Sequence, residues 1–287
     1  MQLALAIDVG GTKMAAGLVT AEGELVTSVS DPTPGGGDAE SLFSVVLDLI
    51  DGVGGASDAV VCGVGCGGPM TRGGEEVSPL NIPGWRRFPL RARLAGFTGL
   101  PTFVDNDAKA LALGEGWRGA AAGVDNFIAM VVSTGVGGGI VLDGRLLDGE
   151  SGNAGHIGHV IVEPVGRLCA CGGRGCLEAE ASGPAIAALT GRPAAEADAA
   201  AVERAGTLVG RAVASVANLL DLRLAVVGGS VALGFGSPFF VAAQAELDAR
   251  ARLDFSAGAR IVPVGLGAAG PLIGAAAVGW GGLRASV

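Results

Sequence analysis

Most of the imidazole and thiol side chains of this 287-residue chain lie in one stretch, 152–176. The string GNAGHIGH at 152–159 contains both histidines, and the string CACGGRGC at 169–176 contains three of the five cysteines. The N-terminal segment has no basic leader, and Asp8 interrupts its apolar run, so we expect a cytoplasmic protein with reduced thiols. In that setting the pattern favours metal binding over disulfide formation.

A glycine turn after an apolar strand is the second pattern that could carry chemistry. Its first copy combines a carboxylate, exposed backbone amides, a hydroxyl and an ammonium, supplied by Asp8, Gly10, Gly11, Thr12 and Lys13. Such a turn can hold phosphate oxygens while Asp8 reaches a magnesium ion, directly or through water. The alternative is a tight hairpin with a surface lysine.

Two more glycine turns follow later in the chain. The string STGVGGG at 133–139 again joins hydroxyls to glycines, and VVGGSV at 226–231 ends a third apolar strand. A pair of opposed turns, the first and the second, implies a nucleotide in a cleft. We predict that the second turn contacts the nucleotide through Thr134, Gly135, Gly137 and Gly138.

The elements that must present these turns follow one plan twice. Strand, glycine turn, strand and hairpin turn occupy 3–24, and the same order returns at 130–147, which suggests two related domains. The other expected elements are a helix capped by Asp38, a buried strand at 60–64, a short helix from Ser182, an alanine-rich helix to about Leu220 and a strand at 224–227.

We expect the domain boundary near 117–125, where glycine and alanine follow a helical segment. The first domain would contain 1–117, rejoined by a C-terminal helix at 272–287, and the second would contain 118–271. Residues 261–283 carry no charge and are long enough to cross a bilayer. Because prolines and glycines interrupt them, we interpret them as a strand, a turn and a core helix, with a membrane span as the alternative.

The composition limits the class of partner. Apolar residues make up 49% of the chain, enough to fill two cores, while aromatic residues make up only 4%. The net charge of -9 argues against binding of a nucleic-acid backbone, which needs a clustered basic surface. We therefore expect a small-molecule ligand and neither a nucleic acid nor a membrane as partner.

The paired glycine turns resemble those of the actin-like sugar kinases, and VDNDA at 104–108 resembles the Asn-Asp pair of their ROK family (repressors, open reading frames, kinases). The resemblance extends over 3–277. It implies an α/β fold of two duplicated actin-like (ribonuclease H-like) domains, with ATP and a hexose in the interdomain cleft. It also implies that Asn106 binds sugar hydroxyls and that Asp107 is the general base. The alternative is that Asp105 or Asn106 only caps the next helix.

The resemblance implies further ligand and metal contacts. Sugar contacts fall on Gly68, Asn81 and Glu178, and the purine would lie against Gly228 and Gly229. The zinc ligands of the family match His159, Cys169, Cys171 and Cys176. Three thiolates and one imidazole close a tetrahedral shell, which implies structural rather than catalytic zinc. Cys62 and Cys66 lie in an apolar segment, and we expect them in the core.

His156 departs from the family pattern, in which a glutamate at this place binds the sugar. The string AGHIGH resembles that of bacterial N-acetylmannosamine kinases, and an imidazole can donate a hydrogen bond to the carbonyl of an acetamido group. We therefore assign His156 to the sugar site. The alternative is a histidine at a helix start, satisfied by backbone.

The function that follows is ATP- and Mg²⁺-dependent phosphorylation of the 6-hydroxyl of a hexose, with N-acetylmannosamine favoured and glucose as the alternative. A sugar-responsive regulator of the same family is less favoured, because only seven residues precede Asp8 and the base and phosphate residues are all present. An actin-like filament or chaperone would need neither the Asn-Asp pair nor the zinc ligands. The resemblance also implies a homodimer.

Overall fold

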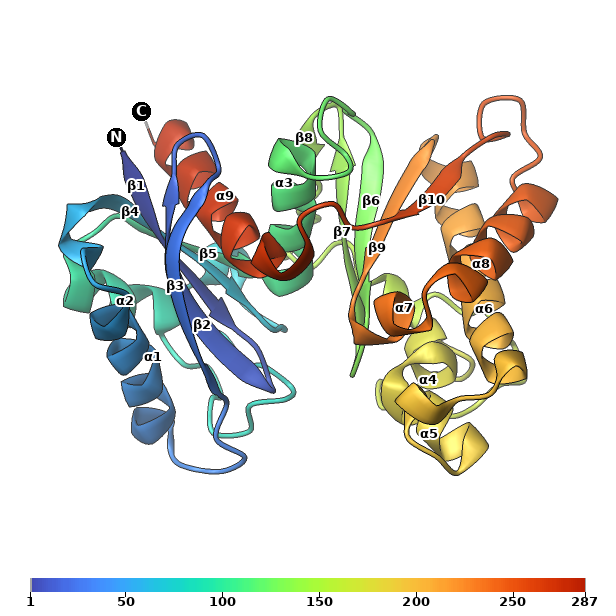
Figure 1. The fold of residues 1–287 in the computed structure, drawn as a ribbon, viewed down its shortest axis with the longest axis horizontal. Helices are drawn as coiled ribbons and strands as arrows, with labels where there is room; N and C mark the ends of the chain where they lie inside the picture. Colours follow the sequence, from blue (N-terminus) through green and yellow to red (C-terminus); the bar gives the residue numbers. More distant parts are fainter. Residues whose placement is uncertain (1, 287) are drawn as a thin grey trace. The chain divides into compact units, whose positions relative to one another are not determined.

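The computed structural model describes residues 2–286 and divides into two compact units (Figure 1). Unit 1 contains Met1–Ala122, Asp148–Ala154 and Gly265–Val287, and unit 2 contains Gly123–Leu147 and Gly155–Val264. The sequence places 148–154 in the second domain, whereas in the structure this segment groups with unit 1. The units are defined by their internal contacts, so the boundaries of independently folding domains stay a prediction.

Unit 1 is built on a five-stranded mixed sheet of order β3-β2-β1-β4-β5. The strands are β1 (Leu3–Val9), β2 (Lys13–Thr20), β3 (Leu25–Pro32), β4 (Ala59–Cys66) and β5 (Thr102–Asn106). β1 pairs antiparallel with β2 and parallel with β4, and β4 pairs parallel with β5. The carboxyl ends of β1, β4 and β5 therefore meet at one edge of the sheet.

Unit 2 repeats this plan with the order β10-β9-β6-β7-β8. Its strands are β6 (Phe127–Val132), β7 (Val136–Leu142), β8 (Arg145–Leu146), β9 (Leu224–Gly228) and β10 (Arg260–Pro263). β6 pairs antiparallel with β7 and parallel with β9, and so takes the place that β1 has in unit 1. The predicted duplication of an α/β unit is confirmed.

Helices cover both faces of the unit 1 sheet. They are α1 (Ala39–Val53), α2 (Leu90–Thr98), α3 (Asp107–Arg118) and α9 (Gly270–Ala285), with 3-10 turns at Ala56–Asp58, Arg72–Gly74 and Gly267–Ala269. Asp38 caps α1 by accepting the Ser41 amide hydrogen at 2.8 Å, as predicted. α9 packs closely on β4, where Gly63 leaves room for its backbone: a Cβ atom placed on Gly63 would lie 2.0 Å from the Ala275 carbonyl oxygen.

The interpretation of 261–283 as a strand followed by a core helix is confirmed by β10 and α9. Ala275, Ala276 and Trp280 of α9 are buried against one face of the unit 1 sheet. Among the described residues, the helices include none with the length and apolar character that a membrane span requires.

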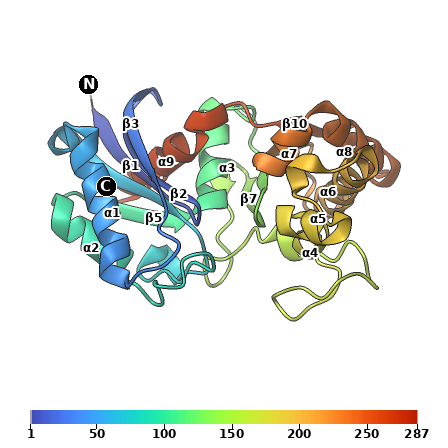
Figure 2. The same cartoon turned by 60° about the horizontal axis from the view of Figure 1, so that its bottom comes forward.

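The helices of unit 2 are α4 (Leu177–Ala181), α5 (Gly183–Thr190), α6 (Ala199–Leu220), α7 (Ser230–Phe235) and α8 (Ser237–Arg250), with 3-10 turns at Ile157–His159 and Ala194–Glu196 (Figure 2). Ser182 caps α5, as predicted. α6 and α8 approach closely: a Cβ at Gly206 would lie 2.4 Å from the Phe239 carbonyl oxygen, and one at Gly210 would lie 2.2 Å from that of Ala243. The glycines of α6 thus let the backbones of the two helices pack closely.

Glu115 of α3 has a fully buried side chain that joins two distant backbone segments of unit 1. Its carboxylate accepts the amide hydrogens of Ala120 at 2.7 Å, Gly265 at 2.9 Å and Leu266 at 3.1 Å. Ala120 lies just before the chain leaves unit 1 after residue 122, and Gly265 begins the last segment of this unit. Glu115 therefore holds both of these connections to α3.

We expect Glu115→Ala to lower the free energy of unfolding by about 3 kcal/mol or more, because it removes three hydrogen bonds to a charged group, each of which contributes about 1.5–3 kcal/mol. Urea denaturation followed by circular dichroism measures this loss. Glu22→Ala, which removes an exposed carboxylate of the same unit, is the matched control and should change little. An unfolding midpoint equal to that of the control would contradict the role of Glu115.

Candidate active site

Two carboxylates lie together at the carboxyl edge of the unit 1 sheet. Asp8 is near the end of β1, and Asp107 begins α3 directly after β5. Burial, then the negative charge of Asp107, raise the pKa of Asp8 to about 7, against the opposing effect of Lys13. Gly65 of β4 lies between the two residues. A Cβ atom placed on this glycine would lie 3.7 Å from Asp107 Cα and 3.7 Å from Asp8 Oδ1.

The predicted phosphate turn between β1 and β2 is a tight hairpin. The Gly10 amide donates to the Lys13 carbonyl oxygen at 3.1 Å, and Thr12 and Lys13 are exposed. These features also fit the alternative of a simple surface hairpin. A hairpin alone does not account for the buried carboxylate of Asp8 beside a second acid.

The residues predicted to contact sugar from unit 1 lie around the same edge. A Cβ at Gly68 would lie 3.2 Å from Asn106 Nδ2, and one at Gly11 would lie 2.4 Å from the Cβ of Asn81. Gly11 is therefore needed for Asn81 to pack against the first glycine turn. The structure brings the predicted phosphate and sugar residues of this unit together.

Asn106 caps α3, because its Oδ1 accepts the Ala108 amide hydrogen at 3.0 Å. Asn106 is thus the residue that caps the helix, and Asp105 is not; that Asn106 serves as a cap only stays an untested alternative. Capping occupies the side-chain oxygen of Asn106, so the amide Nδ2 is the atom through which it could donate to a sugar oxygen. A cap and a ligand contact are compatible in this residue.

Cys62 and Cys66 are buried in β4, as predicted. Burial, followed by the charges of Asp107 and Asp8, raises the pKa of the Cys66 thiol well above its ordinary value. Burial likewise raises the pKa of Cys62 to about 12. Both thiols therefore stay protonated, and both pack in the hydrophobic core of unit 1.

In unit 2, Glu178 lies against the second glycine turn. Its Oε2 accepts the Val136 amide hydrogen at 2.8 Å, and a Cβ at Gly135 would lie 2.9 Å from the same oxygen. Gly229 directly follows β9 and has φ +95, and a Cβ there would lie 2.3 Å from the Val132 carbonyl oxygen. The structure thus joins Glu178 to the turn that contains Thr134, Gly135, Gly137 and Gly138.

The segment 152–159, which contains both histidines, packs on β7 through Gly155 and Gly158. A Cβ at Gly155 would lie 2.4 Å from the Gly138 carbonyl oxygen, and one at Gly158 would lie 2.1 Å from that of Val136. His156 is exposed and precedes the 3-10 turn Ile157–His159, and its ring lies 6.2 Å from the ring of His159. The glycines therefore place both imidazoles beside the second glycine turn.

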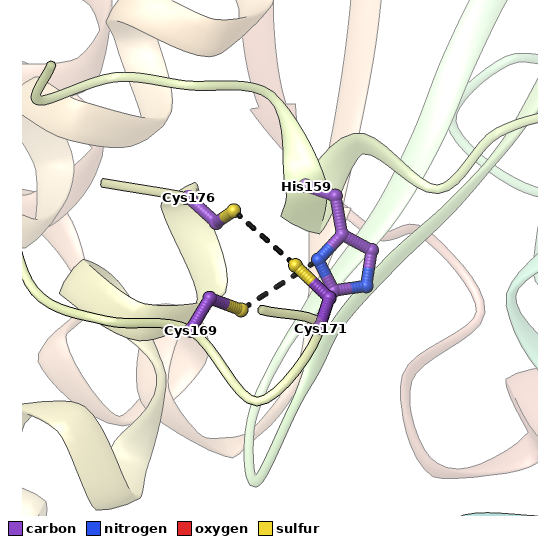
Figure 3. Close-up of side chains that lie close together, drawn as sticks. All are labelled: His159, Cys169, Cys171 and Cys176. Atoms are coloured by element: carbon purple, nitrogen blue, oxygen red, sulfur yellow. Dashed lines mark hydrogen bonds between the residues drawn. The ribbon is translucent and has the colours of Figure 1, made fainter. Parts of the chain in front are cut away.

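Four side chains converge in the loop that follows (Figure 3). The ligand atoms of His159, Cys169, Cys171 and Cys176 all lie within 4.8 Å of one another. Cys171 Sγ lies 3.7 Å from Cys176 Sγ, and Cys169 Sγ lies 3.8 Å from His159 Nδ1. Zinc–sulfur bonds of about 2.3 Å at tetrahedral angles place two sulfurs about 3.8 Å apart. The spacing and the donor set fit a tetrahedral zinc ion.

A cluster of ion pairs around the buried Lys109, beside the Asn-Asp pair, is not among the residues predicted from the sequence. Lys109 Nζ lies 3.1 Å from Asp105 Oδ1 and 2.6 Å from Asp148 Oδ1. The available signal was a lysine flanked by apolar residues, four positions after an aspartate. Asp148 is distant in sequence, so only the fold reveals it as a partner.

Comparison with known proteins identifies the family of this chain. The ROK family profile matches residues 4–279. An N-acetylmannosamine kinase of Escherichia fergusonii is 37% identical over 250 residues, 81% of this chain and 84% of that protein. A glucokinase of Thermotoga maritima is 41% identical over 184 residues, 63% of this chain and 58% of that protein. A ROK family glucokinase from Streptomyces griseus, solved with glucose and AMPPNP, is 29% identical with a TM-score of 0.85, and the match covers 97% of this chain and 99% of that chain. With a family match over nearly its whole length and a relative of this similarity, the chain belongs to the ROK family.

Proposed function

We propose that this protein transfers the terminal phosphoryl group of ATP to the 6-hydroxyl of a hexose, with N-acetylmannosamine favoured over glucose. The observation that carries the proposal is the pair of carboxylates, Asp8 and Asp107, at the carboxyl edge of the unit 1 sheet. The relatives support it, since they are kinases of N-acetylmannosamine and of glucose, and the solved glucokinase holds glucose and an ATP analogue.

Asp107 acts in this proposal as the general base. It is exposed at the first turn of α3, so a hydroxyl can approach its carboxylate, and Asn106 beside it orients the sugar through Nδ2. As the hydroxyl oxygen attacks phosphorus, its proton passes to the Asp107 carboxylate. The backbone amides of the two glycine turns offer donors for phosphate oxygens.

Asp8 fits the role of a magnesium-site residue. A buried carboxylate whose pKa is raised to about 7 gains from a nearby divalent cation, and oxygen donors are the ligands that Mg²⁺ prefers. Magnesium bound there, directly or through water, would neutralise phosphate charge. Asp8 and Asp107 therefore have separate tasks, one toward the nucleotide and the other toward the sugar.

The proposed zinc ion has a structural task. Its ligands come from the 3-10 turn Ile157–His159, from the loop around Cys169 and Cys171, and from Cys176 at the start of α4. A closed shell of one imidazole and three thiolates would hold these segments together. His156 and Glu178, the proposed sugar residues of unit 2, flank the ligands His159 and Cys176 in sequence.

The preference for an acetamido sugar rests on His156. An ionised glutamate only accepts hydrogen bonds, whereas an imidazole can also donate one to the carbonyl oxygen of a 2-acetamido group. A site built to pair with that group discriminates against a sugar that lacks it. The homodimer implied by the family stays a prediction, which light scattering after size-exclusion chromatography would test.

A coupled kinase assay across glucose, mannose, N-acetylglucosamine and N-acetylmannosamine tests the proposal. We expect a higher kcat/KM for N-acetylmannosamine than for glucose, and we expect His156→Glu to narrow or reverse that preference. Wild-type protein that prefers glucose over every acetamido sugar would support the glucokinase alternative. Protein that binds a sugar but phosphorylates none would support the regulator.

A further inference from the structure

Lys109 lies in α3, one helical turn after the residues proposed to bind and deprotonate the sugar. Its side chain is only 3% exposed. The ammonium contacts Asp148 Oδ1 at 2.6 Å, Asp105 Oδ1 at 3.1 Å and the Gly152 carbonyl oxygen at 3.2 Å. These three acceptors match the three hydrogens of an ammonium group. Such an arrangement is specific, because a buried ammonium must find a partner for each donor.

One of these acceptors leads directly to the Asn-Asp pair. Asp105 Oδ1, which receives the ammonium, also accepts the Asn106 amide hydrogen at 2.8 Å. Burial raises the pKa of Asp105, whereas the charge of Lys109 lowers it. Lys109 opposes that rise, and its ammonium restrains the oxygen that accepts the Asn106 amide hydrogen.

The other two acceptors belong to residues 148–154, which we call the strap. The strap is closed by a hydrogen bond from the Ala154 amide to the Asp148 carbonyl oxygen at 3.0 Å. Asn153 Nδ2 also donates to the Met70 carbonyl oxygen at 3.4 Å. The strap groups with unit 1, yet the chain continues from Ala154 into Gly155 and His156. A shift of the strap would therefore move Gly155 and His156.

We propose that Lys109 is a positioning residue of the kinase reaction. Its ammonium group contacts both the Asp105–Asn106–Asp107 segment and the strap that leads into His156, and so holds the two together. Removal of Lys109 leaves two carboxylates and a carbonyl without their donor, which loosens the turn and the strap together. The inference rests on the proposed function, because it assigns the sugar to Asn106, Asp107 and His156.

The main test is Lys109→Met, which keeps the length of the side chain and removes its charge. We expect kcat/KM for the sugar to fall about 10- to 100-fold, since small displacements of reacting groups are costly. The KM for ATP should change less than the KM for the sugar. Amide hydrogen exchange at Ala154, measured by mass spectrometry or NMR, should become faster.

Two further variants separate positioning from a loss of stability. Lys109→Met combined with Asp105→Asn removes the orphaned buried charge, so Tm should return toward the wild-type value while kcat/KM for the sugar stays low. Asp148→Asn keeps the buried Lys109 and Asp105 pair and weakens only the strap contact, at a residue whose side chain is 58% exposed. We expect it to fold normally, to speed exchange at Ala154 and to raise the sugar KM.

The matched control is Arg93→Met, which removes a 2.7 Å ion pair with Glu40 elsewhere in unit 1 and should leave the kinetics unchanged. If the double variant regains wild-type kcat/KM together with its Tm, or if Asp148→Asn leaves both strap exchange and sugar KM unchanged, the proposal is overturned. Failure of the proposed function is distinguishable, because wild-type protein would then phosphorylate no sugar. Strap exchange in the variants would still report whether Lys109 holds the strap.

Discussion

Asp107→Asn is expected to lower kcat by roughly 10² to 10⁴-fold, the usual contribution of a general base. The substitution keeps the size of the side chain and removes its capacity to take a proton. Sugar KM should stay within a few-fold, because Asn106 and the residues around it are unaltered. Steady-state kinetics with saturating ATP, together with sugar binding by calorimetry, measure the two effects separately.

The matched control is Asp48→Asn, the same change at an exposed carboxylate of α1. It should leave kcat unchanged. Asp107→Asn also removes a negative charge that raises the pKa of Asp8, so that pKa should fall. Near wild-type turnover in Asp107→Asn would exclude this residue as the base.

The second large effect is expected for Cys171→Ala, which removes an exposed member of the proposed zinc shell. Wild-type protein purified without chelators should contain one zinc ion per chain, and the variant should have lost most of it. Because metal-binding free energy contributes to the folding of the loop that carries the ligands, this loop should become disordered. We expect kcat/KM for the sugar to fall about 10- to 100-fold, through His156 and Glu178.

Elemental analysis and amide exchange of 156–178 provide readouts that do not depend on activity. Cys62→Ala is the matched control, since it removes a buried thiol of β4 outside the metal site and should retain zinc. Full zinc content in Cys171→Ala would contradict its assignment as a ligand. Metal-free wild-type protein would contradict the site as a whole.

Local sequence patterns alone predicted much of the architecture. The helix cap at Asp38, the strands on either side of each glycine turn and the repetition of that plan all follow from residues close together in the chain. Apolar periodicity, helix caps and glycine turns each depend on a few neighbouring residues, so they can be predicted without knowledge of the fold. The clustering of His159 with three cysteines has the same origin, because the four ligands lie within 18 positions of sequence.

The tertiary structure decided what distant segments do to one another. It brings Asp107 beside Asp8 because β1 and β5 flank β4 in parallel, and no local pattern states that strand order. That proximity, with burial, is what raises the pKa of Asp8 to about 7. Electrostatic interaction depends on distance in space and on desolvation, so it cannot be read from spacing in sequence.

The same holds for the two buried charges of α3. The sequence shows a lysine and a glutamate in one predicted helix. It does not show that Lys109 contacts Asp148 and Gly152 of the strap, or that Glu115 accepts the amide hydrogens of Gly265 and Leu266. Their partners lie from 39 to 151 positions away along the chain. A buried charge persists only where the fold supplies its hydrogen-bonding partners, and for these residues the packing of unit 1 alone determines which partners those are.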